Sequence, residues 1–141
     1  MRGAVHHIDL TSRDLARSTA FYEEVLAFLG YRRARSDDTG VDWDLRDSGH
    51  LVCSVGVKPA RSDRDHDRYS AGLHHLAWHA ASRDDVDRLH ALLVRLGARI
   101  LDAPAEYPAY GAGYYALFFA DPDGLKLEFV HWREMAKRTG C

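Results

Sequence analysis

The sequence predicts an α+β fold built from two copies of one β-α-β-β-β module. Two repeated segments indicate the duplication. VHHIDL at residues 5–10 returns as LHHLAW at 73–78, and LGYR at 29–32 returns as LGAR at 96–99. The length of 141 residues suits one ordinary domain, whereas two half-length modules would be too small to bury good cores separately. We therefore expect a single domain, residues 1–141, made of two halves.

The first module begins with a strand and a helix. Residues 5–10 form the expected strand, and TSRD at 11–14 supplies polar side chains that can cap a helix at 15–29. Apolar side chains in that helix recur with a period near 3.6 residues, which predicts one buried face. Gly30 follows as a C-terminal stop. Three extended segments separated by turn residues complete the module, at 31–35, 41–46 and 51–57.

The second module repeats this order. We expect a strand at 74–79, then a helix at 84–96 that begins at the cap signal of Ser82 and Asp85 and ends at Gly97. The remaining features are strands at 99–102, 114–120 and 125–130, a flexible loop at 107–113 and the turn DPDG at 121–124. The predicted boundaries are module one at about 4–57, a polar linker at about 58–71, module two at about 72–131 and a tail at 132–141.

Composition and charge exclude several classes of protein. A formal charge of −2 gives no general attraction to nucleic acid or membranes, so we expect small molecules as partners. No apolar run approaches the ~20 residues that span a bilayer. The chain starts with a strand rather than a signal peptide, which predicts a cytoplasmic protein. Cys53 and Cys141 do not make a disulfide framework.

Strand alternation places three potential metal ligands on definable faces. His7 shares a face of its strand with Asp9, His75 shares one with His79, and Glu128 lies in an apolar strand. A buried carboxylate is costly unless it is paired or bound to a cation. Histidines at repeat-related positions are suitable partners if the two modules curl around a shared cavity. Two imidazoles and one carboxylate would bind one divalent metal, Fe, Mn, Zn or Ni, with open coordination positions.

The chain resembles the vicinal oxygen chelate (VOC) superfamily, which holds glyoxalase I, extradiol dioxygenases, fosfomycin resistance proteins and bleomycin resistance proteins. The most specific motifs are HIDL at 7–10, RDLARS at 13–18, HLA at 75–77 and above all FADPDGLKLE at 119–128. The resemblance implies an open, eight-stranded, barrel-like mixed sheet around a metal cavity. It also implies that His7, His75 and Glu128 are the metal ligands, and that the protein is a homodimer.

Three nearby residues are expected to lie outside this ligand set. A fourth ligand position of glyoxalase I falls by resemblance on Cys53, which aligns with Glu128 when the two hairpins are matched from their turns. Cysteine in an apolar strand typically acts as a small hydrophobe. His6 and His74 should face away from the ligands, where packing against the helices or a hydrogen bond with the backbone would explain them. The remaining three-ligand set is the one that the resemblance implies for extradiol dioxygenases and fosfomycin resistance proteins.

Four further residues are candidates for catalysis. Asp9 could orient a water or act as a base near the metal, although a salt bridge to a neighbouring Arg or Lys explains it equally well. His79 could transfer protons or simply lie at the rim of the cavity. Tyr110 and Tyr115 could donate a hydrogen bond to a substrate oxyanion, with aromatic packing as the simpler account.

These expectations describe a metal-dependent enzyme that chelates vicinal oxygens of a small organic substrate. The reaction would be that of a glyoxalase-like lyase or isomerase, or of an extradiol-type dioxygenase. One alternative is an epoxide-opening transferase of the fosfomycin resistance type, although Asp9 would place negative charge near its phosphonate substrate. The other is a non-catalytic protein that binds a small molecule, such as a bleomycin-like drug.

Overall fold

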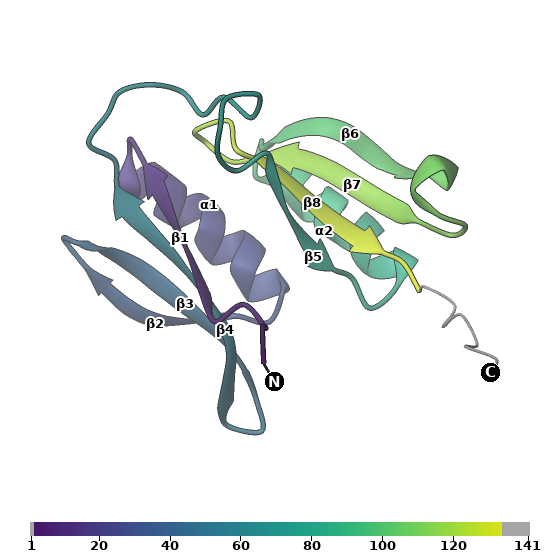
Figure 1. Cartoon of the computed structure of the whole chain (residues 1–141), viewed down its shortest axis with the longest axis horizontal. Helices are drawn as coiled ribbons and strands as arrows, with labels where there is room; N and C mark the ends of the chain where they lie inside the picture. The colour runs from purple at the N-terminus through teal and green to yellow at the C-terminus, as the bar shows by residue number, and fades with distance from the viewer. Residues whose placement is uncertain (1, 134–141) are drawn as a thin grey trace. The chain divides into compact units, whose positions relative to one another are not determined.

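The computed structural model describes residues 2–133 as two compact units. Unit 1 runs to Asp67 and includes the separate segment Asp121–Gly124, whereas unit 2 comprises Arg68–Ala120 and continues from Leu125. Each unit is a four-stranded sheet with one α-helix against one of its faces (Figure 1). Most of the predicted tail at 132–141, including Cys141, lies outside the described residues.

Unit 1 contains the first β-α-β-β-β module. Its sheet has the strand order β1-β4-β3-β2, with β1 parallel to β4 and the other neighbours antiparallel. The elements are β1 (His7–Ser12), α1 (Leu15–Phe28), β2 (Arg32–Asp37), β3 (Gly40–Asp47) and β4 (His50–Pro59). All five predicted elements of this module are present, within three residues of their expected bounds.

Unit 2 repeats this topology with the strand order β5-β8-β7-β6, in which β5 is parallel to β8. The elements are β5 (His75–His79), α2 (Arg83–Arg95), β6 (Arg99–Glu106), a 3₁₀ turn (Pro108–Tyr110), β7 (Tyr115–Ala120) and β8 (Lys126–His131). Strand β6 is longer than expected because Ala105 and Glu106 resume pairing with β7 beyond two register shifts. The α+β class and the paired modules are confirmed, and the eight strands form two four-stranded sheets.

Local sequence explains where each helix begins and ends. The Asp14 carboxylate accepts a hydrogen bond from the Arg17 backbone N–H at 3.0 Å, and the Ser82 hydroxyl oxygen accepts one from the Asp85 N–H at 3.1 Å. Such caps satisfy backbone donors that have no partner within the helix. Gly30, with φ of 94°, allows the left-handed turn that ends α1.

The core of each unit lies between its helix and its sheet. In unit 1, Trp43 and Val55 from the strands meet Tyr22 and Leu26 from α1, and all four are almost fully buried. In unit 2 the corresponding layer consists of Val86, Leu89 and Leu93 from α2 and Leu117, Phe119 and Leu127 from β7 and β8. Burying one such aliphatic side chain contributes roughly 1.5–3 kcal/mol. Since strand residues alternate between faces, the face opposite each helix is left for polar and aromatic side chains.

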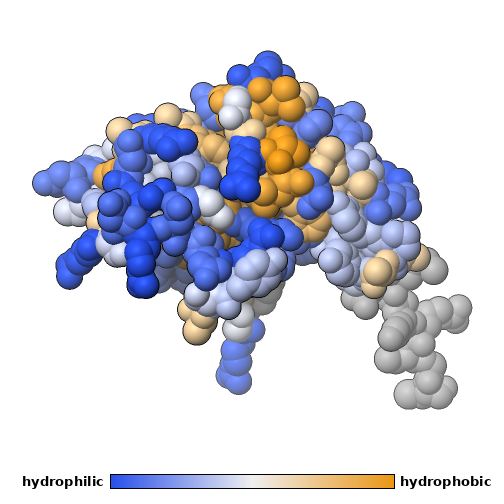
Figure 2. Space-filling view, turned by 90° about the horizontal axis from the view of Figure 1, so that it is seen from above, coloured by the Kyte–Doolittle hydropathy of each residue, from blue (hydrophilic) through white to orange (hydrophobic). Residues whose placement is uncertain are grey.

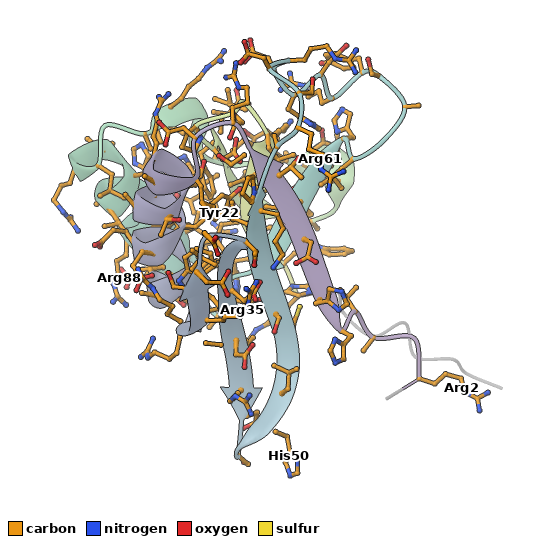
Figure 3. All side chains as sticks on the ribbon, turned by 90° about the vertical axis from the view of Figure 1, so that its left-hand side faces the viewer. Arg2, Tyr22, Arg35, His50, Arg61 and Arg88 are labelled. Carbon is orange, nitrogen blue, oxygen red and sulfur yellow. The ribbon has the colours of Figure 1, made fainter. Side chains whose placement is uncertain are left out.

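The turn between β7 and β8 belongs to unit 1. The Tyr22 hydroxyl, between α1 and the sheet in Figure 3, donates to an Asp121 carboxylate oxygen at 2.8 Å. Arg13 forms an ion pair with Asp123 at 2.9 Å. Burial, reinforced by the Asp121 charge, raises the pKa of Tyr22 well above its usual value, so the hydroxyl remains a donor. The predicted DPDG turn is present, and its carboxylates complete unit 1.

One face of the molecule is mainly hydrophilic. Figure 2 shows mainly polar residues over the face in view, interrupted by a patch of apolar side chains. Among the described residues, no helix is long and apolar enough to cross a membrane.

Candidate functional site

The face of unit 2 opposite α2, which we call its helix-free face, brings His75 and Glu128 together. In the parallel pairing of β5 and β8, Ala77 lies opposite Glu128 and His75 lies opposite Lys126. The Nε2 atom of His75 lies 3.2 Å from the Oε2 atom of Glu128. The carboxylate is buried, with 3% of its side chain exposed, while the imidazole is 37% exposed. The structure therefore contains a buried carboxylate against an accessible histidine, as strand alternation predicts.

Tyr114 holds the other oxygen of this carboxylate. Its hydroxyl donates to Oε1 of Glu128, directly before β7 begins. Burial raises the pKa of Tyr114 far above the ordinary phenol value, and the hydrogen bond to Glu128 and the negative charge of that group raise it further. Tyr114 therefore stays protonated at physiological pH, and the two oxygens of Glu128 are divided between a phenol and an imidazole.

Aromatic rings surround Glu128 on the same side. The Tyr107 ring packs edge-on against Phe118, with centroids 5.2 Å apart, and Tyr114 contacts Tyr110 at 5.3 Å and Trp132 at 5.7 Å. These side chains pack around the buried cluster of Ala116, Phe118 and Val130. Lys126 adds a positive charge, with its Nζ 4.3 Å from the centre of the Phe118 ring. The helix-free face thus combines a carboxylate with an apolar wall and a cation.

The catalytic candidates on unit 2 lie in three different settings. Tyr110 is 62% exposed and stacks on Tyr107, close to Tyr114. His79 is exposed at the end of β5, opposite Val130. Tyr115 differs from the expectation, because its hydroxyl donates to Asp87 of α2 at 2.7 Å and therefore lies on the helix side of the sheet.

Tyr114 is thus the tyrosine beside the carboxylate, and the sequence argument did not select it. Adjacent strand residues face opposite ways, so Tyr114 and Tyr115 could not both reach Glu128. Phe118 lies opposite Glu128 in the pairing of β7 and β8. Residues separated from Phe118 by an even number of positions share its face of the sheet, so the position of Tyr114, four residues earlier, could have assigned it to the helix-free face.

Both adjacent histidine pairs are held by a contact between ring nitrogens. Nδ1 of His74 lies 2.7 Å from Nδ1 of His75, and Nδ1 of His6 lies 3.0 Å from Nδ1 of His7. His6 and His74 are exposed rather than packed toward the helices, which corrects the expectation. The reason is that each ring is turned toward the histidine that follows it rather than toward the helix.

The helix-free face of unit 1, opposite α1, carries His7 and Asp9, and Asp9 belongs to an ion-pair network. Lys58 Nζ donates to Asp42 at 2.6 Å and lies 3.8 Å from an Asp9 oxygen, and Arg35 also donates to Asp42 at 2.6 Å. Burial raises the pKa of the Asp42 carboxyl, but the hydrogen bonds from Lys58 and Arg35 outweigh this effect and lower it overall. For Asp9, the ion pair is the ordinary role that the sequence left open.

The strand register corrects the proposed counterpart of Glu128. In unit 2, Glu128 lies opposite the residue two positions after His75; in unit 1, Gly56 lies opposite Asp9, two positions after His7. Gly56, not Cys53, therefore occupies the equivalent position. The turn-based alignment failed because the β3–β4 hairpin has a register shift and a longer second strand. Cys53 pairs with Leu45 and shares the helix side of the sheet with Val55.

A side chain at position 56 would have no room. A Cβ atom built on Gly56 would meet the carboxylate oxygens of Asp9 and Asp42, the latter at 2.6 Å. The space that Glu128 fills in unit 2 is therefore taken in unit 1 by an ion-pair network.

The predicted ligands are distributed between the units. His75 and Glu128 lie together in unit 2, and His7 lies at the start of β1 in unit 1. Within residues 2–133, no group of three or more His, Cys, Asp or Glu side chains is gathered as a metal cluster. The pair in unit 2 still provides one imidazole nitrogen and one carboxylate oxygen, the donor types suited to Zn, Fe, Mn or Ni.

Comparisons with known proteins place the chain in a family. Residues 4–129 match the sequence profile of the glyoxalase/bleomycin resistance protein/dioxygenase superfamily. The Bacillus subtilis protein YqjT is 36% identical over 126 residues, covering 89% of this chain and 97% of the relative. A Bacillus halodurans structure provisionally described as a glyoxalase has a TM-score of 0.78 and 31% identity, over 93% of this chain and 97% of that one.

A more distant structure has the same fold. Lactoylglutathione lyase from Agrobacterium tumefaciens is 18% identical with a TM-score of 0.62, over 92% of this chain and 93% of that chain. The profile match spans both modules. The chain therefore belongs to the glyoxalase/bleomycin resistance protein/dioxygenase superfamily, the VOC superfamily that its motifs resemble.

Proposed function

We propose that this protein is a divalent-metal-dependent enzyme that chelates vicinal oxygens of a small organic substrate, with His7, His75 and Glu128 as metal ligands. The 3.2 Å separation of His75 Nε2 and Glu128 Oε2 carries the proposal. Two donors on one tetrahedrally coordinated zinc ion lie about 3.3 Å apart, so the pair has a spacing that suits shared coordination. A buried carboxylate beside a phenol and an imidazole also gains stability from an added cation.

When bound, a divalent cation would act as a Lewis acid toward two adjacent substrate oxygens. The surrounding residues have separate tasks. Tyr114 holds Oε1 of Glu128 and so leaves Oε2 directed toward His75. Lys126 places positive charge on the same face, where it would attract an anionic oxygen. Phe118 and Trp132 would exclude water and pack against the apolar part of the substrate.

Gly56 favours a three-ligand set over a four-ligand glyoxalase I set. Residue 56 supplies no donor atom of its own, Cys53 faces the helix side, and the nearby Asp42 carboxylate is already paired with Lys58 and Arg35. A three-ligand site retains more positions for substrate, as extradiol-type oxygenation requires. A glyoxalase-like isomerase or lyase reaction suits the two-module size, and one structural relative is named a lactoylglutathione lyase. We therefore propose these two reaction classes for testing.

The test begins with metal content. Protein purified without chelators should contain about one divalent metal per chain, and His7→Ala, His75→Ala and Glu128→Ala should each reduce its affinity. Asp42→Asn, in the unit 1 ion-pair network, is the matched control and should leave affinity unchanged. Wild-type protein without stoichiometric metal, combined with unchanged affinity in all three alanine variants, would reject the metal site.

Two assays then separate the reaction classes. Catechols with Fe(II) under O2 test ring cleavage, and a hemithioacetal with Ni(II) or Zn(II) tests isomerisation. Wild-type activity that Glu128→Ala abolishes would assign the class. Absence of ring cleavage over the whole catechol panel would remove the dioxygenase assignment.

A second candidate function is a small-molecule binding protein without catalysis. It is favoured by the ring cluster of Tyr107, Tyr110, Tyr114 and Trp132, because Tyr110 leaves an aromatic surface accessible. Binding of metal-free bleomycin, whose bithiazole rings are planar, should then quench tryptophan fluorescence equally with and without EDTA. Loss of quenching in EDTA would favour the metal-dependent function.

We also propose that the protein is cytoplasmic. We propose in addition that it is a homodimer, because two-module members of the VOC superfamily are usually dimers. Light scattering coupled to size-exclusion chromatography should give twice the chain mass of 15.9 kDa. A concentration-independent monomer would reject the dimer.

A further inference from the structure

The two adjacent histidine pairs share one arrangement that the metal ligands alone do not explain. In both pairs the Nδ1 atoms of neighbouring rings approach each other, at 2.7 Å in unit 2 and 3.0 Å in unit 1. The rings are nearly perpendicular, at 78° and 87°. Because the arrangement occurs separately in each unit, it is a property of the repeated histidine pair rather than an accident of one loop.

A contact of this length between two imidazole nitrogens requires one proton between them. Two bare nitrogens would repel through their lone pairs, and two N–H groups would repel through their protons, so one ring donates and the other accepts. The histidine whose Nδ1 is engaged keeps Nε2 for another partner. In His75 that atom is the one that lies 3.2 Å from Glu128.

We propose that His74 and His6 are positioning residues that hold the rings of His75 and His7 with Nε2 available for the metal, an inference that rests on the proposed metal function. Metal-binding histidines generally anchor their second ring nitrogen to a carboxylate, carbonyl or water. Here a neighbouring imidazole has that task. Tyr69 supports His74 in turn, with its ring edge-on at 5.7 Å.

Histidine has a property in this position that a carboxylate lacks. When His75 binds a metal through Nε2, its Nδ1 carries the proton and His74 must accept. When His75 donates from Nε2 to Glu128 instead, its Nδ1 is bare and His74 must donate. A neutral imidazole can do either by changing tautomer. The pair therefore keeps its hydrogen bond in both states and the ring of His75 need not move.

The test compares zinc affinity in the full chain by competition with a chromophoric chelator. His74→Phe keeps a ring of similar shape but removes the nitrogen, and should weaken Zn²⁺ binding by about 10- to 100-fold. His74→Asn places an acceptor oxygen near the former Nδ1 and should restore affinity to within a few-fold of wild type. His6→Phe should weaken binding in the same direction. His50→Phe, at the exposed tip of the β3–β4 hairpin (Figure 3), removes a histidine elsewhere and should have no effect.

Nitrogen-15 NMR supplies the readout that a merely structural role would not change. With Zn²⁺ bound, the wild type should show a protected proton on Nδ1 of His75, and this signal should be lost in His74→Phe and return in His74→Asn. Unchanged zinc affinity in His74→Phe, with the wild type binding zinc, would overturn the positioning role alone. A wild type that bound no zinc would instead reject the proposed function and the positioning role together.

Discussion

Gly56 and Glu128 occupy the same position in the two copies of the module, yet their surroundings are opposite. In unit 1 the position has no side chain, and the space is filled by carboxylates that Lys58 and Arg35 neutralise. In unit 2 the position holds a buried carboxylate that contacts the phenol of Tyr114 and the imidazole of His75. In unit 1 the carboxylate of Asp42 is paired with cations, whereas in unit 2 Lys126 lies over the Phe118 ring and Glu128 contacts a phenol and an imidazole.

The difference in burial strengthens this comparison. Lys58 and Asp42 keep 29% and 24% of their side chains exposed, whereas Glu128 keeps 3%. Water screens the unit 1 network, so each of its ion pairs contributes modestly. The carboxylate in unit 2 lacks that screening, so the same charge is both more costly alone and more strongly attracted to a cation. Burial, more than residue type, distinguishes the face of unit 1 from the face of unit 2 that we propose binds metal.

The most severe test rebuilds the missing carboxylate with Gly56→Glu. The new side chain would meet Asp9 and Asp42 at overlapping distances and add a third negative charge, so we expect a loss of about 3 kcal/mol or more in the free energy of unfolding. Urea unfolding followed by circular dichroism measures it. Gly56→Ala has the same steric contact without charge and should lose less. Equal losses of unfolding free energy in the two variants would mean that charge plays no part in excluding a carboxylate side chain from position 56.

The next test removes the phenol from Glu128. Tyr114→Phe should lower Zn²⁺ affinity by about tenfold, because an outer partner that orients a ligand is lost. Tyr115→Phe, one residue along but bonded to Asp87 of α2, is the matched control and should bind zinc like the wild type. If the two variants bound zinc equally, the hydrogen bond from Tyr114 to Oε1 of Glu128 would have no role in metal binding.

Removing the internal cation of unit 1 should have a smaller effect. Lys58→Met leaves Asp42 with Arg35 alone and should cost about 1 kcal/mol of unfolding free energy, a partly exposed pair being screened by water. Arg46→Met breaks the more exposed ion pair with Asp44 and should cost less. Urea unfolding of the two variants supplies the comparison. A larger loss of unfolding free energy in Arg46→Met would contradict the expectation that the Lys58–Asp42 pair contributes more stability than the Arg46–Asp44 pair.

Acid should weaken unit 1 slightly through Asp42. Burial raises the pKa of this carboxyl, but Lys58 and Arg35 lower it below the reference value of 3.8. A depressed pKa gives stability that is present above 3.8 and is lost as pH falls through the lower folded value. Asp42→Asn should therefore show a shallower fall in melting temperature below pH 4, with an effect below about 1 kcal/mol. An identical acid profile would show that this pair does not contribute.

Much of the fold, and the pairing of His75 with Glu128, could be predicted from periodicity and repetition. The repeated segments predicted two modules, and alternation in the last strand placed Glu128 on one face with His75 as its partner. Alignment from the turns put Cys53 opposite Glu128 in the repeat, because residue counts do not reveal a register shift in a hairpin. Only the pairing of β1 with β4 identifies Gly56.

The remaining errors concern residues at the ends of strands. His74 lies one position before β5, and its ring meets that of His75, a contact between neighbouring residues that strand alternation does not predict. Tyr114 lies one position before β7, and parity from Phe118 could have selected it over Tyr115. Strand ends are the least certain part of a pattern-based prediction, and here they carry the groups nearest His75 and Glu128, two of the proposed ligands.

The β7–β8 turn has a consequence for how this protein could have evolved. Asp121, encoded in the second copy of the module, accepts the hydrogen bond of the buried Tyr22 hydroxyl in the first. Gene fission in the linker would keep every strand and helix of unit 1 but leave that hydroxyl without its acceptor. An ancestral single module needed another acceptor at this place, or a second chain to supply one. In this chain the first copy of the module depends on a residue of the second, so separating the halves would call for a compensating change at Tyr22.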